Sequence, residues 1–529
     1  MARNAGGKTM ICKLRAAIAA LVVGVFAALP AQAQELRVAL GSAVTSADPH
    51  FTVLGANSAL ARNVFDGLVN QDDTQGLVPG LALSWTALDA TTWEFKLRDG
   101  VRFHDGSPFE AEDAAASLRR VAAVKGSPSS FLPFVRPIKA VHVVDRLTLR
   151  IETAAPYPLL PGALSRIAIV PRGVEQAGQD AFNAATAAHG TGPYKLASYV
   201  PGDRIVLTRN DAHWGGRPRW ERVTMRIVPN DSARIAALLA GDADLIENVP
   251  TAGAARLRAD PRVKLARVAS NRVMYIHLDS DRAQSPFVRD RAGNPAPNHL
   301  RDVRVRQAIS VAIDRQALVE RVMDGEGVAT GQFVPPGYFG HAPAVATPKA
   351  DRDTARRLLA EAGVPDGFKL TFHAPNDRYP NDEQTAMAIA AMLTRAGIET
   401  GVVAIPAATY FTRASALEFS FILGGAAAET GEASSVLRPL VETFDPARGT
   451  GSGNRGRFSD AELDRLMTEA VATIDAPARE ALLRRATQIA VDKVGVIPLF
   501  FLVNTWASRG DVAYTPRSDG YTLADNARP

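Results

Sequence analysis

The stretch of sequence that decides the fold runs from Leu81 to Arg120 and reads LALSWTALDATTWEFKLRDGVRFHDGSPFEAEDAAASLRR. Apolar and polar side chains alternate over residues 93–97, and they alternate again in a second run that ends at Phe103. Strict alternation is typical of half-buried strands, so we expect two strands here. A three-residue loop with Gly100 at positive φ beside a bulge would pair Phe95 with Phe103, so that the strands form a hairpin.

A helix is expected directly after this hairpin. Ser107 is a suitable N-cap, Pro108 suits the first helical position, and Glu110 stands at the third, which is the order found at helix starts. The helix is expected to run to about Val124. Apolar alternation and turn glycines explain every position of the stretch as scaffold, so we expect the ligand to be bound elsewhere.

The same stretch carries a family resemblance. The order W-x-F-x-L-R-x-G-V-x-F-H-D-G-x-P followed by A-E-D, over residues 93–113, resembles the signature of the family 5 extracellular solute-binding proteins. These proteins are the peptide-type receptors of ABC importers. Residues 190–194, GTGPY, and residues 210–220, NDAHWGGRPRW, resemble two further segments of that family. The resemblance covers nearly the whole chain after residue 33.

The resemblance implies an α/β protein with the two-lobed type 2 fold of periplasmic binding proteins and an extra subdomain in the first lobe. Lobe I would consist of residues 34–54, 189–275 and 497–529, the extra subdomain of residues 55–188, and lobe II of residues 276–496. The residues support the α/β class by themselves. Strands and helices alternate from Val223 onward, as in layers built around a largely parallel sheet.

Residues 1–33 have the three parts of a secretory signal peptide. A basic region precedes an apolar core of 14 residues, Ala16–Leu29, and an A-x-A cleavage site follows at Ala31–Ala33. A membrane anchor needs a longer core, of about 20 residues. Cleavage would lower the formal charge from +5 to +1, because this segment carries four Lys and Arg and no acid. It would also remove the only cysteine, Cys12, which indicates a periplasmic protein without a lipid anchor.

Composition and motifs argue against an enzyme, a metalloprotein or a nucleic-acid-binding protein. The mature chain is almost neutral, so its charge gives no reason to expect nucleic acid. The nine histidines are scattered singly, and the sequence has no G-x-S-x-G elbow and no P-loop. Residues 451–456 fit G-x-G-x-x-G, but they follow a turn-rich segment and not a strand, so we expect a loop there. We therefore expect no catalytic residue, no cofactor and no metal site.

The resemblance places the ligand between the lobes, at the ends of strands. Thr45 and Ser46 lie in the loop after the first strand, which borders the cleft in the family, although turn chemistry at Asp48-Pro49 explains this loop equally well. Asn504 and Trp506 follow the final strand. Trp506 suits either a ligand pocket or the hydrophobic core.

A second group of candidates follows the strand expected at residues 368–372. Asn376, Arg378 and Tyr379 lie in the loop after this strand. Arg378 can hold a carboxylate with two hydrogen bonds, and Tyr379 can stack on a ligand. We expect these residues to bind one end of the solute.

The loop expected to close over the ligand begins with Gly424 and Gly425. Many relatives have the pattern G-W-x-x-D-x-x-D-P here, with a Trp wall and an Asp that receives the α-ammonium group of a peptide. This chain has Gly425 in place of the Trp, and Ala428 aligns with the Asp. Glu429 or Glu432 can supply a carboxylate that attracts an amine, and the alternative is that both are solvated.

We therefore predict a periplasmic receptor that captures a peptide or peptide-like solute by hinge closure and delivers it to an inner-membrane ABC permease. We expect it to be a monomer. The missing Trp and Asp keep open a receptor of the same fold for a non-peptide solute, such as an opine, a sugar, a glutathione-like compound or a metal chelate. A more remote alternative is an exported hydrolase.

Overall fold

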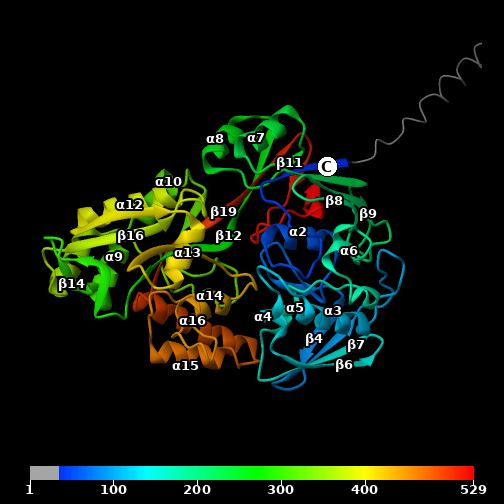
Figure 1. The fold of residues 1–529 in the computed structure, drawn as a ribbon, viewed down its shortest axis with the longest axis horizontal. Helices are drawn as coiled ribbons and strands as arrows, with labels where there is room; N and C mark the ends of the chain where they lie inside the picture. The colour runs from blue at the N-terminus through cyan, green and yellow to red at the C-terminus, as the bar shows by residue number, and fades with distance from the viewer. Residues whose placement is uncertain (1–34) are drawn as a thin grey trace, which may run out of the picture.

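The computed structural model describes residues 35–529, and the predicted signal peptide lies outside them. Figure 1 shows three parts: a mainly green part at the top, a yellow and orange part at the left, and a blue and cyan part at the right. We call them lobe I, lobe II and the extra subdomain. Within residues 35–529, no helix is long and apolar enough to span a membrane.

Two long strands connect the lobes, β12 (Val263–Leu278) and β19 (Val496–Arg509), and we call them the hinge strands. They pair antiparallel, and their register shifts between Ala269 and Val273. Beyond this shift β12 also pairs with a strand of lobe II, β18 (Phe421–Ala427). The lobes therefore share one continuous sheet, which passes from lobe I to lobe II through β12 and β19 (Figure 1).

Lobe I is built on the part of the sheet with the strand order β19-β11-β1-β10-β9-β8. Its elements are β1 (Glu35–Leu40), β8 (Tyr194–Val200), β9 (Arg204–Arg209), β10 (Arg222–Ile227), β11 (Leu245–Ile246), β20 (Ala513–Tyr514), β21 (Ala527–Arg528), α7 (Asp231–Ala240) and α8 (Thr251–Ala259). β1 runs parallel to both of its neighbours. The side chain of Asn230 caps the start of α7, and Gly241, with φ of +86°, ends it in the left-handed conformation that favours glycine.

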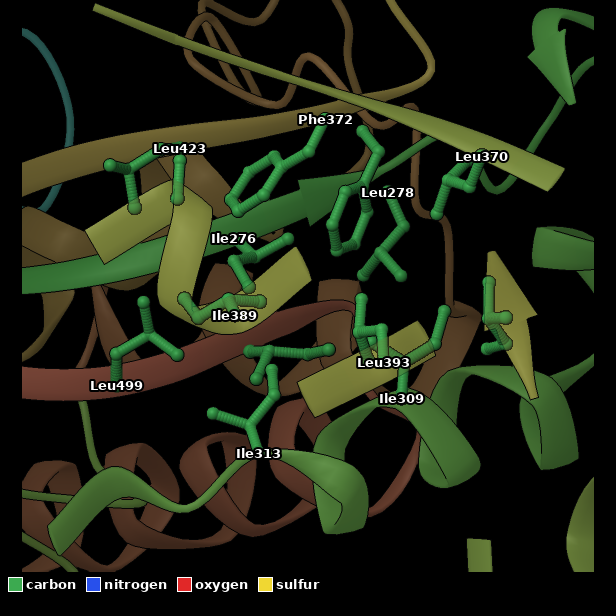
Figure 2. Packing of buried hydrophobic residues seen from close by; sticks show 14 of the residues in the cluster. Ile276, Leu278, Ile309, Ile313, Leu370, Phe372, Ile389, Leu393, Leu423 and Leu499 are labelled. Carbon is green, nitrogen blue, oxygen red and sulfur yellow. The ribbon is translucent and has the colours of Figure 1, made fainter. Parts of the chain in front are cut away.

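Lobe II is built on the other part of the sheet, with the order β14-β13-β16-β18-β12. Its elements are β13 (Gln284–Arg289), β14 (Pro295–Pro297), β15 (Gly327–Ala329), β16 (Phe368–Pro375), β17 (Ile398–Ile405), α9 (Val303–Ala312), α10 (Arg315–Arg321), α11 (Arg352–Glu361), α12 (Asp382–Ala396), α13 (Ala407–Ser415), α14 (Ser434–Leu440), α15 (Ala461–Ala470) and α16 (Ala476–Asp492). Figure 2 shows its core, where Ile276 and Leu278 of β12 and Phe372 of β16 pack with Leu393 of α12. This burial holds the helices on the sheet.

The extra subdomain contains a separate sheet with the order β4-β5-β7-β6. Its elements are β2 (Val69–Gln71), β3 (Leu77–Pro79), β4 (Ala82–Ala87), β5 (Thr92–Leu97), β6 (Ile138–Asp145), β7 (Thr148–Thr153), α3 (Ala111–Ala123), α4 (Leu132–Val135) and α5 (Leu160–Leu164), with α2 (Gly55–Val64) and α6 (Gln179–Asn183) beside lobe I. Phe95 of β5 and Leu118 of α3 lie in its core.

The hairpin predicted to pair Phe95 with Phe103 is wrong. Both edges of β5 are already occupied, because β5 pairs with β4 on one side and with β7 on the other. Residues 101–109 instead form a loop that bonds to itself, with Phe103 N donating to Ser107 O at 2.9 Å. Gly100 has a positive φ of +75°, as predicted.

The helix after this loop, α3, begins later than predicted. Glu110 is its N-cap, in place of Ser107, and the Asp113 carboxylate accepts a hydrogen bond from Glu110 N at 2.8 Å. The Ser107 hydroxyl is occupied in the preceding turn, where it donates to the Asp105 carboxylate at 2.6 Å. The prediction therefore placed the N-cap at Ser107, whereas the structure has it at Glu110.

Packing of the cores gives limits that differ from the predicted division. The core of the extra subdomain lies between Leu68 and Ile169, which is narrower than the predicted range 55–188. Leu60 of α2 packs in the core of lobe I. Residues 497–529 were predicted for lobe I, but Leu499 lies in the core of lobe II. The border between the lobes therefore falls within β19 and not at its start.

Candidate functional site

A cavity of about 570 Å³ lies where the two lobes meet. Lobe I contributes Gly41 and Thr251 to its lining, the hinge strands contribute Arg272 and Asn504, and lobe II contributes Arg378. Small-molecule sites are typically clefts of about 300–1,000 Å³. Size and position both suit a ligand that the lobes enclose.

Arg234 of α7 lines the lobe I wall, and its role there is structural. Its guanidinium donates hydrogen bonds to the backbone oxygens of Glu247 and Asn248 at 2.9 and 2.7 Å. It also pairs with the Asp231 carboxylate at 2.6 Å. Because this side chain is buried and fully engaged, it fixes the loop after β11 as one side of the cavity.

Glu326, which follows α10, also lines the cavity. Its buried carboxylate pairs with Arg258 and Arg267, each at 3.1 Å. It also accepts a hydrogen bond from the Thr505 hydroxyl of β19 at 2.8 Å. These contacts tie the segment after α10 to lobe I and to β19, so Glu326 already has its cationic partners.

Tyr379 forms the lobe II wall, and it explains the glycine at position 425. Its hydroxyl accepts a hydrogen bond from Gly425 N at 3.1 Å and lies 3.3 Å from Gly425 O. A Cβ atom at Gly425 would lie only 2.9 Å from the Tyr379 ring. Gly424 is equally crowded, because its Cβ would lie 2.6 Å from the Tyr275 hydroxyl. Aromatic rings therefore fill the space beside both glycines.

Arg272 lines the cavity and was not among the predicted site residues. It lies within the register shift in β12 and opposite Ala427 of β18. Burial lowers the pKa of its guanidinium; Tyr379 opposes this shift, and the positive charge of Arg378 adds to it. The sequence did carry a signal for this residue. Arg272 lies within β12 and directly precedes the apolar run 273–276, where a charged side chain needs a reason.

Neither predicted acidic residue lines the cavity. Glu432 is buried within lobe II, where its carboxylate accepts from Ser434 at 2.7 Å and pairs with Arg479 at 3.4 Å. Burial raises the pKa of the Glu432 carboxyl. Glu429 instead pairs with Arg166 of the extra subdomain at 3.4 Å. A role for either one in binding an amine stays a prediction.

The remaining predicted residues lie in different surroundings. Asn504 lines the cavity and donates to the backbone oxygens of two tail residues, Arg517 and Ser518, each at 3.1 Å. Trp506 is buried in the lobe I core, where its Nε1 donates to Thr522 at 2.9 Å. Asn376 is exposed.

The loop after β1 is held by internal hydrogen bonds. The Thr45 hydroxyl is exposed and donates to Asn57 Oδ1 at 3.3 Å. The buried Ser46 hydroxyl donates to Asn183 Oδ1 at 3.2 Å. Ligand contacts of these two residues stay predictions. Among residues 35–529, no group of three or more His, Cys, Asp or Glu side chains is placed to hold a metal ion.

A family model described as bacterial extracellular solute-binding proteins, family 5, middle, matches residues 76–447, which is more than half of the chain. The chain belongs to this family. The resemblance drawn from residues 93–113 is thereby confirmed. Its predicted function as a solute-binding protein is confirmed with it.

Named relatives of this solute-binding protein match it over most of their length. Heme-binding protein A of Haemophilus influenzae is 28% identical and covers 88% of this chain and 85% of its own. Glutathione-binding protein GsiB of Salmonella paratyphi A is 29% identical, with 89% and 90% covered. The structure of HbpA2 from Haemophilus parasuis, at 23% identity, superposes with a TM-score of 0.81 over 93% of this chain and 99% of that one. The predicted two-lobed α/β fold class is confirmed.

Proposed function

We propose that this solute-binding protein is the periplasmic receptor of an ABC importer and that its ligand is a peptide or peptide-like solute. The solute would occupy the cavity between the lobes and pass from there to an inner-membrane permease. The signal peptide predicted for residues 1–33 supports a periplasmic location. The relatives that bind heme and glutathione support a solute of about the size of these two compounds.

The observation that carries this proposal is the position of the cavity at the hinge strands. Residues of both lobes and of the register shift in β12 line the same space. A solute that contacts both walls stabilises the closed form, because it makes all of its contacts only when the lobes come together. Arg378 and Tyr379 would hold one end of it from lobe II.

Thermal-shift screening of the purified protein tests the proposal. The panel contains dipeptides, tripeptides including glutathione, hemin, opines, sugars and metal chelates. A specific ligand raises the Tm, because binding to the native state adds RT ln(1 + [L]/Kd) to the free energy of unfolding. A shift with dipeptides or with tripeptides other than glutathione supports the proposed class. Shifts confined to the other compounds would exclude it and favour a non-peptide receptor.

The same samples distinguish a receptor from an exported hydrolase. A receptor releases its ligand unchanged, whereas a hydrolase converts it. We expect mass spectrometry after long incubation to recover the bound solute intact and in full. Time-dependent cleavage that scales with protein concentration would contradict a pure binding role.

A further inference from the structure

The cavity between the lobes has an excess of positive charge. Three arginines line it, Arg234, Arg272 and Arg378, together with two acids, Asp231 and Glu326. Asp231 is paired with Arg234. Glu326 is paired with two arginines outside the cavity lining. After these pairs are formed, the charges of Arg272 and Arg378 remain.

The guanidinium groups of these two arginines are free for a ligand. Across residues 35–529, neither one makes a hydrogen bond or an ion pair with another side chain, and each residue uses only its backbone N–H, toward Ser270 and Asp382. Arg378 also lies over the Tyr379 ring, at 5.2 Å from its centre. A partly buried arginine such as Arg272 is costly to leave unpaired, so its free guanidinium points to a partner that arrives from outside.

The surroundings do not favour a third positive charge. Glu429 is close enough to raise the pKa of Arg272, but its carboxylate is already paired with Arg166 at 3.4 Å. The α-ammonium group of an ordinary peptide would therefore add to the repulsion between Arg272 and Arg378. Two carboxylates would neutralise both arginines when closure excludes water.

Building on the proposed function, we propose that the cavity selects a solute with two carboxylates, one for Arg272 and one for Arg378. Arg378 binds its carboxylate from the open lobe II wall, and Arg272 binds the other one at the hinge. Peptides with an acidic side chain, γ-glutamyl peptides and N-succinyl amino acids all carry two carboxylates. Arg272 thus determines the specificity for a second carboxylate, whereas Arg234 only fixes the lobe I wall of the cavity.

Matched ligand pairs that differ in one carboxylate test this inference. The pairs are Ala-Glu and Ala-Gln, glutathione and its monoethyl ester, and N-succinylalanine and its monoamide. Calorimetric titration should give a Kd for the diacid that is lower by about tenfold or more in every pair that binds. Equal affinity within the pairs would overturn the inference but leave the proposed peptide class intact.

Substitution of Arg272 gives the second readout. In Arg272→Gln the preference for the diacid should fall to about threefold or less. The substitution weakens binding of the diacid but not of the matched ligand that lacks the second carboxylate. The Tm without ligand should be unchanged or higher, since an unpaired charge is removed. Arg234→Gln is the matched control, and its Tm should fall because its buried hydrogen bonds are lost.

The possible results separate the two proposals. If only the N-succinyl pair binds, with the diacid preferred, the peptide class fails and the two-carboxylate inference stands. If Arg272→Gln lowers the Tm as Arg234→Gln does and keeps the diacid preference, Arg272 is structural and the inference fails. If no compound of any pair binds, the two-carboxylate inference fails, and the thermal-shift panel decides the peptide class by itself.

Discussion

Arg378 and Arg357 are both exposed arginines of lobe II, but only Arg378 belongs to the cavity lining. Arg378→Ala should weaken binding of a carboxylate ligand by about tenfold or more and leave the Tm without ligand unchanged. Titration calorimetry measures the first effect and calorimetric unfolding the second. Arg357→Ala, which removes only an exposed ion pair to Glu361, is the control with unchanged affinity. Equal affinity of both variants would remove Arg378 from the site.

Gly425 is needed because its neighbours leave no room for a side chain. A Cβ there would lie 2.9 Å from the Tyr379 ring and 3.0 Å from Met274 Sδ, so Tyr379 must move and its bonds to the Gly425 backbone weaken. Gly425→Ala should lower the free energy of unfolding by ~1–3 kcal/mol. Gly401→Ala is the control, because nothing lies within 4 Å of that Cβ. Urea unfolding measures the stability of both variants. Equal stability of Gly425→Ala and Gly401→Ala would show that Tyr379 can move at no cost.

At the residue scale, two of the residues predicted from loops at strand ends, Arg378 and Asn504, line the cavity. Their contact with a ligand stays a prediction. Arg272 was missed because it lies inside a strand, and period-two alternation does not report where a strand passes between two lobes. Trp506 was open between pocket and core, and it packs in the core of lobe I.

At the scale of elements, alternation over residues 93–103 predicted one strand correctly and one incorrectly. Both runs bury apolar side chains, and Phe103 is as buried as Phe95. Burial alone produces the alternation, but strand pairing also needs a free edge, and β5 has none because β4 and β7 occupy both. β7 begins about fifty residues after β5, so a local pattern cannot show that β7 occupies the edge of β5.

A buried histidine connects α3 to lobe I and should make stability depend on pH. Arg120 lies 3.1 Å from His50 Nδ1, and His50 Nε2 lies 2.8 Å from Ala168 O. Arg120 can only donate, so His50 is held neutral with its proton on Nε2. Burial lowers the pKa of His50 to about 4, and the charge of Arg120 adds to this.

Acid should destabilise the protein, because the unfolded chain takes up a proton at His50 more readily than the native state does. The unfolded chain binds a proton to His50 below about pH 6.5, whereas the native state does so only near pH 4, so stability is complete above 6.5 and falls toward 4. When the pH is lowered from 7 to 5, the free energy of unfolding of His50→Gln should fall by ~2 kcal/mol less than that of the unsubstituted protein. Urea unfolding at both pH values measures this difference. The exposed His142 provides the control, since His142→Gln should keep the full loss; equal losses in both variants would refute the linkage.

At the scale of the whole molecule, the two lobes are linked by a sheet that continues through the hinge. The register shift in β12 and the cavity lining meet at residues 270–273, so a rotation of the lobes changes the cavity directly. Composition and strand-helix order were sufficient to predict the α/β class. They were insufficient for the border between the lobes, because β19 contributes Leu499 to the core of lobe II and Trp506 to the core of lobe I, and a local pattern does not report which core a side chain enters.

A connection between lobe II and the extra subdomain lies at Glu429, and it should favour the closed form. Glu429 of lobe II pairs with Arg166 of the extra subdomain at 3.4 Å, and its backbone oxygen accepts from Gln71 and Gln75. Glu429→Gln keeps the backbone contacts and removes the charge pair, whose Arg166 side is buried. We expect ~0.5–1 kcal/mol less stabilisation of closure, hence a larger radius of gyration without ligand and a Kd weaker by about threefold.

Small-angle X-ray scattering and calorimetry measure these two effects of Glu429→Gln. Saturating ligand should restore the radius of gyration of the variant to that of the unsubstituted protein, because contacts in the cavity favour closure independently of the charge pair. Glu361→Gln removes an exposed pair within lobe II and serves as the control that should change neither quantity. An unchanged radius together with an unchanged Kd in Glu429→Gln would mean that the Glu429–Arg166 pair does not contribute to closure.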